Sequence, residues 1–422
     1  MLKRLRKFQD RHRNVTLGFH LASGRLYKPS HLNVLVSDLL GKREKQADNP
    51  THCEAAVQWL LRAHERSNRG GVSFGYSFSW GWRWPYPETS GYIISSLLDF
   101  REFFPNSPSA GEAYIAAIEI AEWLIKIQLP DGSYNEGLYP INKGTIADKA
   151  SASTQSTAFE TAQAISGLLR IYRDDGKQRY LDAATLGCDW LVKTQSSNGS
   201  WSASYQNQPR SFDSYIAWPL VIMGKMSGNR KYYESAIRNL EWCLSQQHKN
   251  GFFENCSHSL GQPPLTHGIG YAAQGLFETG LLLDESRYIQ AATKTAEVLL
   301  SVFNKKGFLP ARFDSDWTSK DKFTCLTGNA QASLIWSKLY IRTGETKYLT
   351  GARSMNNDLK SLQNLSSANL GIRGGIKGSH PIYGLYITLQ YPNWAAKFFI
   401  DALVAEERAS KMAEKEHWLK NR

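Results

Sequence analysis

The chain has 422 residues and a formal net charge of +12, and 42% of its residues are hydrophobic. This composition is that of an ordinary globular protein, and the length fits two or three domains or one large closed architecture rather than one small core. No segment reaches about 18 uninterrupted apolar residues, so no transmembrane helix is expected. The N-terminus also lacks the apolar core of a secretory signal.

The positive charge is concentrated at the N-terminus, where residues 1–48 carry eleven Lys/Arg against four Asp/Glu. One interpretation is a solvated basic arm. The other is attraction to an anionic partner, either a membrane surface or an acidic polymer. No helix-turn-helix, zinc-finger or RNA-binding signature accompanies the charge, so nucleic acid is not an expected partner.

The five cysteines are widely spaced and form no Cys-x-x-Cys motif. Most lie within helical patterns, so we expect buried free thiols, which favour a reducing compartment. We therefore expect a cytoplasmic protein, with peripheral association at the inner membrane left open. Neither a metal nor a cofactor is expected, because the histidines are scattered and Asp314 and Asp316 make only half of a calcium loop.

One amphipathic pattern recurs along the chain. Each copy starts with an aromatic residue, has apolar residues at i, i+3, i+4 and i+7, and ends in an Asp-Gly, Asn-Gly or Lys-Gly turn. Four clear copies begin at Tyr114, Tyr180, Tyr232 and Tyr288. Weaker copies begin at His52 and Tyr348, so the pattern predicts six helices.

A second helix type lies between these copies and is richer in apolar and small residues. Six segments of this type occur, including ETSGYIISSLLDF, FETAQAISGLLRIY and THGIGYAAQGLFETGLLL. Small residues let helices approach closely, and helices that are apolar on several faces are buried. The chain therefore alternates inner and outer helices.

Six helical hairpins of this kind can close into a ring, an all-α (α/α)6 toroid, with an open solenoid as the alternative. Closure is favoured because the last inner helix is as apolar as the middle ones and no polar capping repeat follows it. We expect a basic extension at residues 1–48, a catalytic toroid at residues 49–408 and a charged helical tail at residues 409–422.

Long loops join each outer helix to the next inner helix, whereas the return connections are tight turns. This asymmetry predicts a site on the long-loop face. The first long loop holds SWGWRWPYPETSGY, in which Trp82, Trp84 and Tyr86 can stack on sugar rings. Pro87 opens the next helix, and Glu88 stands at its positive end, where an ionised carboxylate is stabilised.

Polar residues recur at i, i+4, i+7 and i+11 on one face of the inner helices, where they either converge in a cavity or are satisfied between helices. They are Glu88, Tyr92, Ser95 and Asp99, then His267, Tyr271, Gln274 and Glu278, with Asn393, Lys397 and Asp401 in an approximate copy. The loops add further polar and aromatic candidates. These are Asp213, Glu254, His258, Arg312, Asp316, Trp317, Arg373, Lys377 and His380, with Trp394 at the start of the last inner helix.

Several motifs resemble those of bacterial α/α-toroid proteins encoded with exopolysaccharide and capsule biosynthesis genes. The resemblance covers about residues 50–405 and rests on YPETSGYI, PPLTHGIGYAAQGLFETG, LPARFDSDW, CLTGNAQ, GIRGGIKGS and YPNWAAKFF. More remotely, Tyr86 to Thr89 resemble the Tyr-Pro-x-Thr entry to a helix in the toroid of glucuronyl C5-epimerases, although no copy of that family's N-terminal β-domain is present. The resemblance implies an enzyme of polysaccharide biosynthesis.

Three functions remain open. The leading hypothesis is proton abstraction from an acidic, uronate-containing glycan by a C5-epimerase or lyase, which needs a base, an acid and positive charge. Tyr86 or Tyr271 and His267 would exchange the proton, and basic loop residues, Arg312, Arg373 and Lys377, would neutralise the substrate acid. A glycoside hydrolase would instead pair carboxylates from Glu88, Asp213, Glu254 and Asp316. The third is a non-catalytic glycan-binding or assembly protein, with the remaining candidates, Trp82, Trp84, Trp317, Asn393 and Trp394, contacting the glycan in any case.

Overall fold

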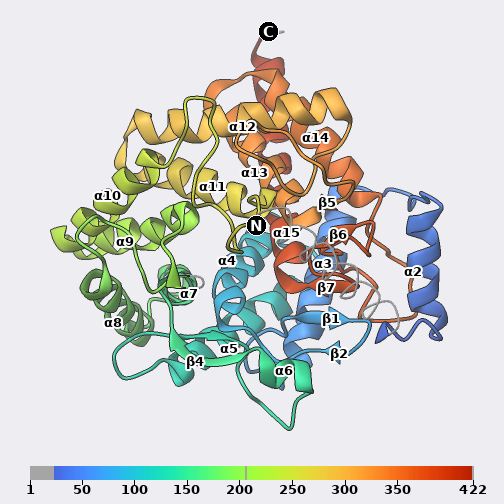
Figure 1. The fold of residues 1–422 in the computed structure, drawn as a ribbon, viewed down its shortest axis with the longest axis horizontal. Coiled ribbons are helices and arrows are strands. Elements are labelled where there is room, and N and C mark those ends of the chain that lie inside the picture. Colours follow the sequence, from blue (N-terminus) through green and yellow to red (C-terminus); the bar gives the residue numbers. More distant parts are fainter. Residues whose placement is uncertain (1–22, 205–206, 421–422) are drawn as a thin grey trace, which may run out of the picture.

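The computed structural model describes residues 23–204 and 207–420, which form mainly helices (Figure 1). Six outer helices alternate with six inner helices, as the repeat predicted. The outer helices are α3 (Asn49–Glu65), α5 (Ala110–Ile127), α8 (Gln178–Thr194), α10 (Arg230–Ser245), α12 (Ser286–Lys306) and α14 (Thr346–Lys360). The inner helices are α4 (Pro87–Phe103), α7 (Ala158–Asp175), α9 (Ser214–Ser227), α11 (Thr266–Leu283), α13 (Leu326–Thr343) and α15 (Asn393–Lys420).

The inner helices close into a ring. Each contacts the next inner helix in sequence, and α15 contacts α4. The all-α (α/α)6 toroid is therefore confirmed, and the open solenoid is excluded because its terminal helices would not meet.

Glycines set the closest approaches inside the ring. A Cβ placed on Gly167 of α7 would lie 2.3 Å from the carbonyl oxygen of Gly91 in α4, and one placed on Gly275 of α11 would lie 2.5 Å from the backbone of Ser214 in α9. These separations leave no room for a side chain, so backbone packs directly on backbone. As predicted, small residues in the inner helices allow these helices to approach one another closely.

The two faces of the toroid differ in their loops. Inner helices turn into outer helices through short connections, two of which use Gly176 and Gly228 in the left-handed conformation. The opposite face carries the long loops with all of the described strands. One sheet joins β1 (Gly75–Ser77) to β2 (Gly81–Trp82) and β7 (Gln390–Pro392).

Two smaller strand pairs complete the long-loop face. They join β3 (Asn135–Gly137) to β4 (Ala152–Ser156), and β5 (Thr324–Cys325) to β6 (Ser379–His380). The same loops carry α6 (Ile146–Ala150) and a 3-10 turn, η2 (Ser211–Asp213). In the three-stranded sheet described above, the edge strand β2 comes from the tryptophan-rich stretch.

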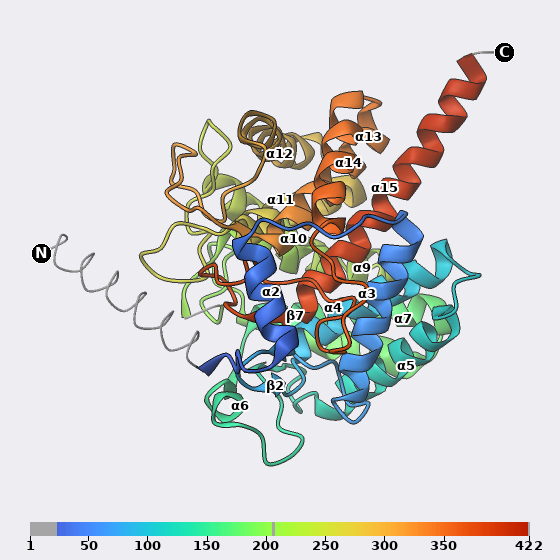
Figure 2. The same ribbon diagram turned by 90° about the vertical axis from the view of Figure 1, so that its right-hand side faces the viewer.

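The described part of the expected N-terminal extension folds onto these loops. Helix α2 (Pro29–Leu39) places His31 in a stack with Phe78 at 4.0 Å and pairs Asp38 with Lys377. Residues 1–22 of the expected basic arm lie outside the described residues. At the other end, α15 runs without a break from the ring into the expected tail and extends beyond the other helices (Figure 2).

The state of the cysteines and the hydropathy of the helices are as predicted from the sequence. All five cysteines, Cys53, Cys188, Cys243, Cys256 and Cys325, are buried free thiols. Within residues 23–204 and 207–420, no helix combines the length and apolar character needed to cross a bilayer.

Candidate functional site

A cavity of about 460 Å³ opens on the long-loop face, at the N-terminal ends of the inner helices. Its walls are largely aromatic, with Phe74, Phe159, Phe212, Tyr386 and Trp394 among them. Its polar groups include two glutamates, Glu88 and Glu136, two histidines, His258 and His267, and the hydroxyls of Tyr86, Tyr92 and Tyr271. Among the described residues that line it, none is a lysine or arginine.

A tyrosine bridges two buried carboxyl groups at one side of this cavity. The Tyr86 hydroxyl lies 2.5 Å from Glu88 Oε2 and 3.1 Å from Glu160 Oε1. Tyr86 is the residue before α4, Glu88 is in the first turn of α4, and Glu160 is in the first turn of α7. The close crossing of α4 and α7 therefore brings the two glutamates together.

Burial decides the protonation of this pair. Burial raises the pKa of Glu88 to about 7, against the opposing effect of the Tyr86 hydrogen bond. Burial, together with the negative charge of Glu88, raises the pKa of Glu160 well above its ordinary value. The positive end of α4 does not keep Glu88 ionised, which corrects the expectation from sequence. At neutral pH the pair retains at least one proton, because two adjacent buried carboxylates repel each other.

A third carboxyl group reaches the same cavity from β3. Glu136 is half-buried, and burial raises its pKa. The cavity thus holds one deeply buried and one partly solvated carboxyl side chain.

Two imidazoles lie on the side formed by α11 and its preceding loop. The rings of His258 and His267 stack at 5.4 Å, and His267 lies 4.4 Å from the ring of Tyr271. His267 Nδ1 is 2.8 Å from Gln331 Oε1, which can only accept, so Nδ1 carries the hydrogen and Nε2 is the basic nitrogen. Burial lowers the pKa of His267 to about 4, so the ring is neutral at pH 7.

An aromatic layer forms the floor of the cavity in the lumen. The Tyr271 hydroxyl donates to the Tyr92 hydroxyl at 3.4 Å, and the ring of Phe398 lies 5.7 Å from Tyr92 and 5.6 Å from Tyr271. Lys397 Nζ lies 4.0 Å from the centre of the Phe398 ring. This layer separates the long-loop cavity from the far end of the lumen.

The structure brings four of the five expected catalytic residues to this cavity, namely Tyr86, Glu88, His267 and Tyr271. Asp213 is not among the lining residues. It accepts hydrogen bonds from Ser204 Oγ at 3.0 Å and the Arg210 backbone N–H at 3.1 Å, and burial raises its pKa to about 7. These contacts place it at the turn before α9.

The expected aromatic platform lies only partly at the cavity. Trp394 lines it, and its indole N–H donates to the Tyr386 hydroxyl at 2.8 Å. Trp82 instead packs 5.1 Å from Trp59, and Trp84 donates to Asn142 Oδ1 at 2.8 Å. Neither tryptophan is among the residues that line the cavity.

Asn393 holds two chain segments at the rim. It is buried, and its Nδ2 donates to the Ser73 carbonyl at 2.9 Å and to Thr89 Oγ1 at 2.8 Å. It therefore ties the start of α15 to α4 and to the first long loop.

The three basic residues expected to neutralise a substrate acid lie elsewhere. Arg312 pairs with Asp321 at 3.2 Å and lines a separate hollow together with Glu254. Arg373 is exposed, and its carbonyl accepts a hydrogen bond from Arg62. Lys377 is buried in its pair with Asp38. The long loops fold these residues away from the carboxyl pair.

Two further residues that were expected to bind substrate, Asp316 and Trp317, lie beside that separate hollow. Asp316 is exposed and accepts hydrogen bonds from the backbone and hydroxyl of Thr318. The indole of Trp317 donates to the Asn250 carbonyl at 3.0 Å.

Glu160, Glu136 and Tyr386 were not among the residues expected from the sequence. A signal for Glu160 was present, because Glu88-Thr89 and Glu160-Thr161 begin two successive inner helices at equivalent positions. No comparable pattern marks Glu136 or Tyr386, which lie in loops.

One family model matches part of the chain. Residues 142–223 match the model described as pectic acid lyase. The match runs from the loop before α6 into α9 and covers less than half of the chain, so it does not establish family membership. Among curated proteins, none matches the sequence.

Solved structures match over most of the chain. An unsaturated glucuronyl hydrolase from Bacillus sp. GL1, responsible for the degradation of glycosaminoglycan, has a TM-score of 0.64 and 12% identity, over 85% of this chain and 96% of that one. An unsaturated glucuronyl hydrolase specific for heparin has a TM-score of 0.63 and 14% identity, over 86% and 98%. An alpha-amylase from Clostridium perfringens has 0.59 and 13%, over 84% and 97%. At these identities the likeness shows the fold alone.

Proposed function

We propose that the chain is a carbohydrate-active enzyme that acts on a uronate-containing glycan by general acid–base catalysis from the long-loop cavity. The observation that carries this proposal is the bridge from the Tyr86 hydroxyl to Glu88 and Glu160. A buried carboxyl group with a pKa near 7 holds a proton at physiological pH and can release it to a substrate.

Two further observations support a glycan as the substrate. Phe, Tyr and Trp side chains form a large part of the cavity wall, and such surfaces stack on the apolar faces of sugar rings. Three of the matches have names that point to uronates, namely the pectic acid lyase model and the two unsaturated glucuronyl hydrolases. A role in polysaccharide synthesis is supported only by the sequence motifs.

A hydrolytic reaction uses the carboxyl groups most directly. Glu88 would donate its proton to the oxygen of the bond to be broken, since burial raises its pKa to about 7 and the nearby Glu136 adds to that rise. Glu136, in the same cavity, would remove a proton from the water that adds to the sugar. The bond from sugar carbon to oxygen breaks, and water supplies the new hydroxyl.

Proton abstraction at C5, by an epimerase or a lyase, is the second candidate. The observation that favours it is the neutral His267, whose Nε2 is basic, next to the Tyr271 ring. Since no lysine or arginine lines the described cavity, a protonated glutamate would have to stabilise the substrate acid by donating a hydrogen bond.

One assay separates these functions. The purified protein is incubated in deuterated water with oligouronates, both saturated and with an unsaturated non-reducing end. New reducing ends that form without a rise in ultraviolet absorbance and disappear in Glu88→Gln support hydrolysis. A rise in ultraviolet absorbance indicates a lyase, and deuterium at C5 without cleavage indicates an epimerase. Binding without turnover of any substrate would overturn the enzyme proposal in favour of a glycan-binding protein.

A further inference from the structure

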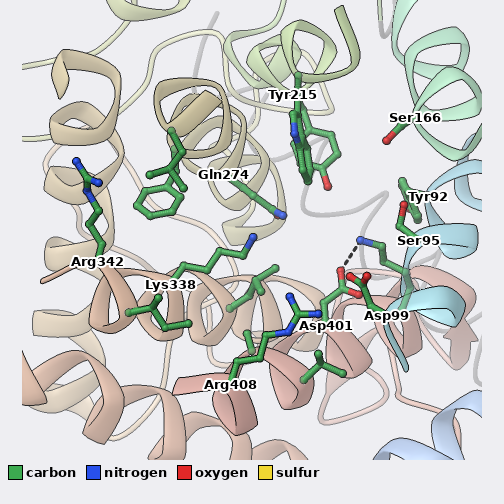
Figure 3. Close-up of a pocket in the computed structure, with 18 of the residues that line it drawn as sticks. Tyr92, Ser95, Asp99, Ser166, Tyr215, Gln274, Lys338, Arg342, Asp401 and Arg408 are labelled. Carbon is green, nitrogen blue, oxygen red and sulfur yellow. Dashed lines mark hydrogen bonds and ion pairs between the residues drawn. The ribbon is translucent and has the colours of Figure 1, made fainter. Parts of the chain in front are cut away.

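A second and larger cavity, of about 720 Å³, occupies the other end of the lumen (Figure 3). All six inner helices contribute to it, with lining residues that include Asp99 of α4 and Arg342 of α13. The aromatic layer at Tyr92 separates it from the long-loop cavity. Its volume falls in the range of small-molecule sites, roughly 300–1,000 Å³.

The inner part of this cavity presents polar groups that lack protein partners. Gln274 is only 2% exposed, and within the described chain its Oε1 accepts no hydrogen bond. Figure 3 shows the Gln274 amide and the Tyr215 ring directed toward the same space, with Ser166 and Ser95 on the facing helices. Buried polar groups are nearly always hydrogen-bonded, so the unpaired oxygen of the Gln274 amide has capacity for a donor from a water molecule or a ligand.

The outer part of the cavity is basic. Lys338, Arg342, Lys397 and Arg408 line it, against the two carboxylates Asp99 and Asp401. Asp401 forms an ion pair with Lys397 at 2.5 Å, and Lys338 forms one with Glu278. Arg342 and Arg408 are exposed at the mouth.

Helix-end electrostatics account for only part of this charge. Arg342 lies in the last turn of α13, where a cation offsets the negative end of the helix. Arg408 does not lie in the last turn of its helix, because α15 continues to Lys420. The helix dipole therefore does not account for a cation at this position. The carboxyl ends of the other inner helices would repel an anion, and the basic excess offsets that repulsion.

We propose that this cavity is a second saccharide site that binds a short acidic oligosaccharide. The sugar hydroxyls, which both donate and accept, would pair with Gln274, Tyr215 and Ser166. The half-buried Trp218 would supply a face for a sugar ring, and the acid group would lie toward Arg342 and Arg408. The site is distinct from the long-loop cavity and does not depend on the reaction proposed there.

The test uses titration calorimetry on full-length Glu88→Gln protein, which should not turn over its ligand. Trigalacturonate is the acidic probe and maltotriose the neutral probe of equal length. We expect Gln274→Leu to abolish one binding event for trigalacturonate. We expect the double variant Arg342→Ala/Arg408→Ala to weaken that event about tenfold, with no comparable change for maltotriose. Circular dichroism checks that each variant is folded.

The outcomes separate this proposal from the proposed enzyme. If the long-loop cavity binds no uronate, a single event remains, and it is still lost in Gln274→Leu. The proposal is overturned if binding is unchanged in both the Gln274 and the double arginine variant, or if no trigalacturonate binds. Tighter binding of octyl glucoside than of trigalacturonate would also overturn it, because the aliphatic part of the wall would then select the ligand.

Discussion

Gly167 of α7 lies directly against the backbone of Gly91 in α4, since a Cβ on Gly167 would lie 2.3 Å from the Gly91 carbonyl oxygen. Both glycines follow a glutamate by one or two turns, Gly91 after Glu88 and Gly167 after Glu160. The helix separation fixed by this contact therefore also fixes the distance between the two carboxyl groups.

Replacing Gly167 by alanine should force the two helices apart. We expect Gly167→Ala to lower the free energy of unfolding by about 1–3 kcal/mol, as overpacking does in cores. We also expect the pKa that limits activity to fall, because separating the helices reduces the burial that raises the pKa of Glu88. Urea unfolding and the pH dependence of kcat/KM measure the two effects.

Gly111→Ala is the matched control, because Gly111 lies in the outer helix α5 and a Cβ placed on it would meet no atom within 4 Å outside its own helix. Alanine should be neutral or raise stability by up to about 1 kcal/mol at this position. Equal effects of the two substitutions would show that the contact between Gly167 and Gly91 does not set the helix spacing.

Glu88→Gln tests the role of the proton. If Glu88 is the general acid, the wild-type rate should fall as the pH rises above about 7, where this group ionises. The amide keeps the shape but cannot donate an acidic proton, so we expect a loss of about 10²–10⁴-fold in kcat and the disappearance of that basic limb. If the rate of the variant still falls above about pH 7, the fall is caused by the ionisation of a group other than Glu88.

The same substitution has a predictable effect on stability. The pKa of Glu88 is raised from 4.5 to about 7 by burial, so between these values the folded protein binds more protons than the unfolded chain. The stabilisation present below pH 4.5 is therefore lost as the pH rises through 7. Relative to the wild type, Glu88→Gln should gain stability over this window, by at most about 3 kcal/mol. Urea unfolding at a series of pH values measures it, and a constant difference would contradict the shift.

Tyr86→Phe removes the hydroxyl between the two carboxyl groups and leaves the ring. The Tyr86 hydrogen bond lowers the pKa of Glu88, so its loss should move the basic limb of activity to higher pH. Tyr139→Phe, in a more exposed part of the rim, should leave the profile unchanged. A limb at the same pH in both variants would exclude the bridge as a determinant of the Glu88 proton.

Much of the fold could be predicted from sequence because its repeats are long and periodic. The copies starting at Tyr114, Tyr180, Tyr232 and Tyr288 correspond to outer helices, and the long loops lie on one face as expected. Tyr86 and Glu88 could also be placed, because their position at the start of an inner helix fixes which end of the lumen they reach.

The rest depends on contacts that the sequence pattern does not encode. Pairing of Glu88 with Glu160 needs the close crossing of α4 and α7, which are separated in the chain by an outer helix, at glycines whose partners only the structure identifies. The side chains of Arg312 and Lys377 lie in irregular loops, so their directions follow the loop path rather than any periodicity.

Substitutions at Lys377 can distinguish a structural role for this residue from a role in substrate binding. Its Nζ lies 2.5 Å from Asp38 Oδ1, and both side chains are only 4% exposed. Removing one partner leaves an uncompensated buried charge, so Lys377→Met should cost about 3–5 kcal/mol. Lys347→Met, which breaks the exposed pair with Glu297, should cost less than about 1 kcal/mol.

The acid sensitivity of this pair has a definite sign. Burial acts to raise the pKa of Asp38, but hydrogen bonds and charge from His380 and Lys377 outweigh it and lower the pKa to about 2. The stabilisation is therefore present above pH 3.8 and is lost as the pH falls from 3.8 through 2. Asp38→Asn should remove this acid-dependent step from the unfolding curve, whereas a step of unchanged size would assign it to other carboxylates.

The double variant Asp38→Asn/Lys377→Met separates the two roles of Lys377. It leaves no unpaired charge, so most of the stability lost in Lys377→Met should return. If the lysine only anchors α2 to the rim, kcat/KM for an oligouronate should return as well. If Lys377 contacts the substrate acid, as the sequence analysis expected, stability should recover while KM stays raised. Unfolding curves and kinetics measured on the same preparations decide between these results.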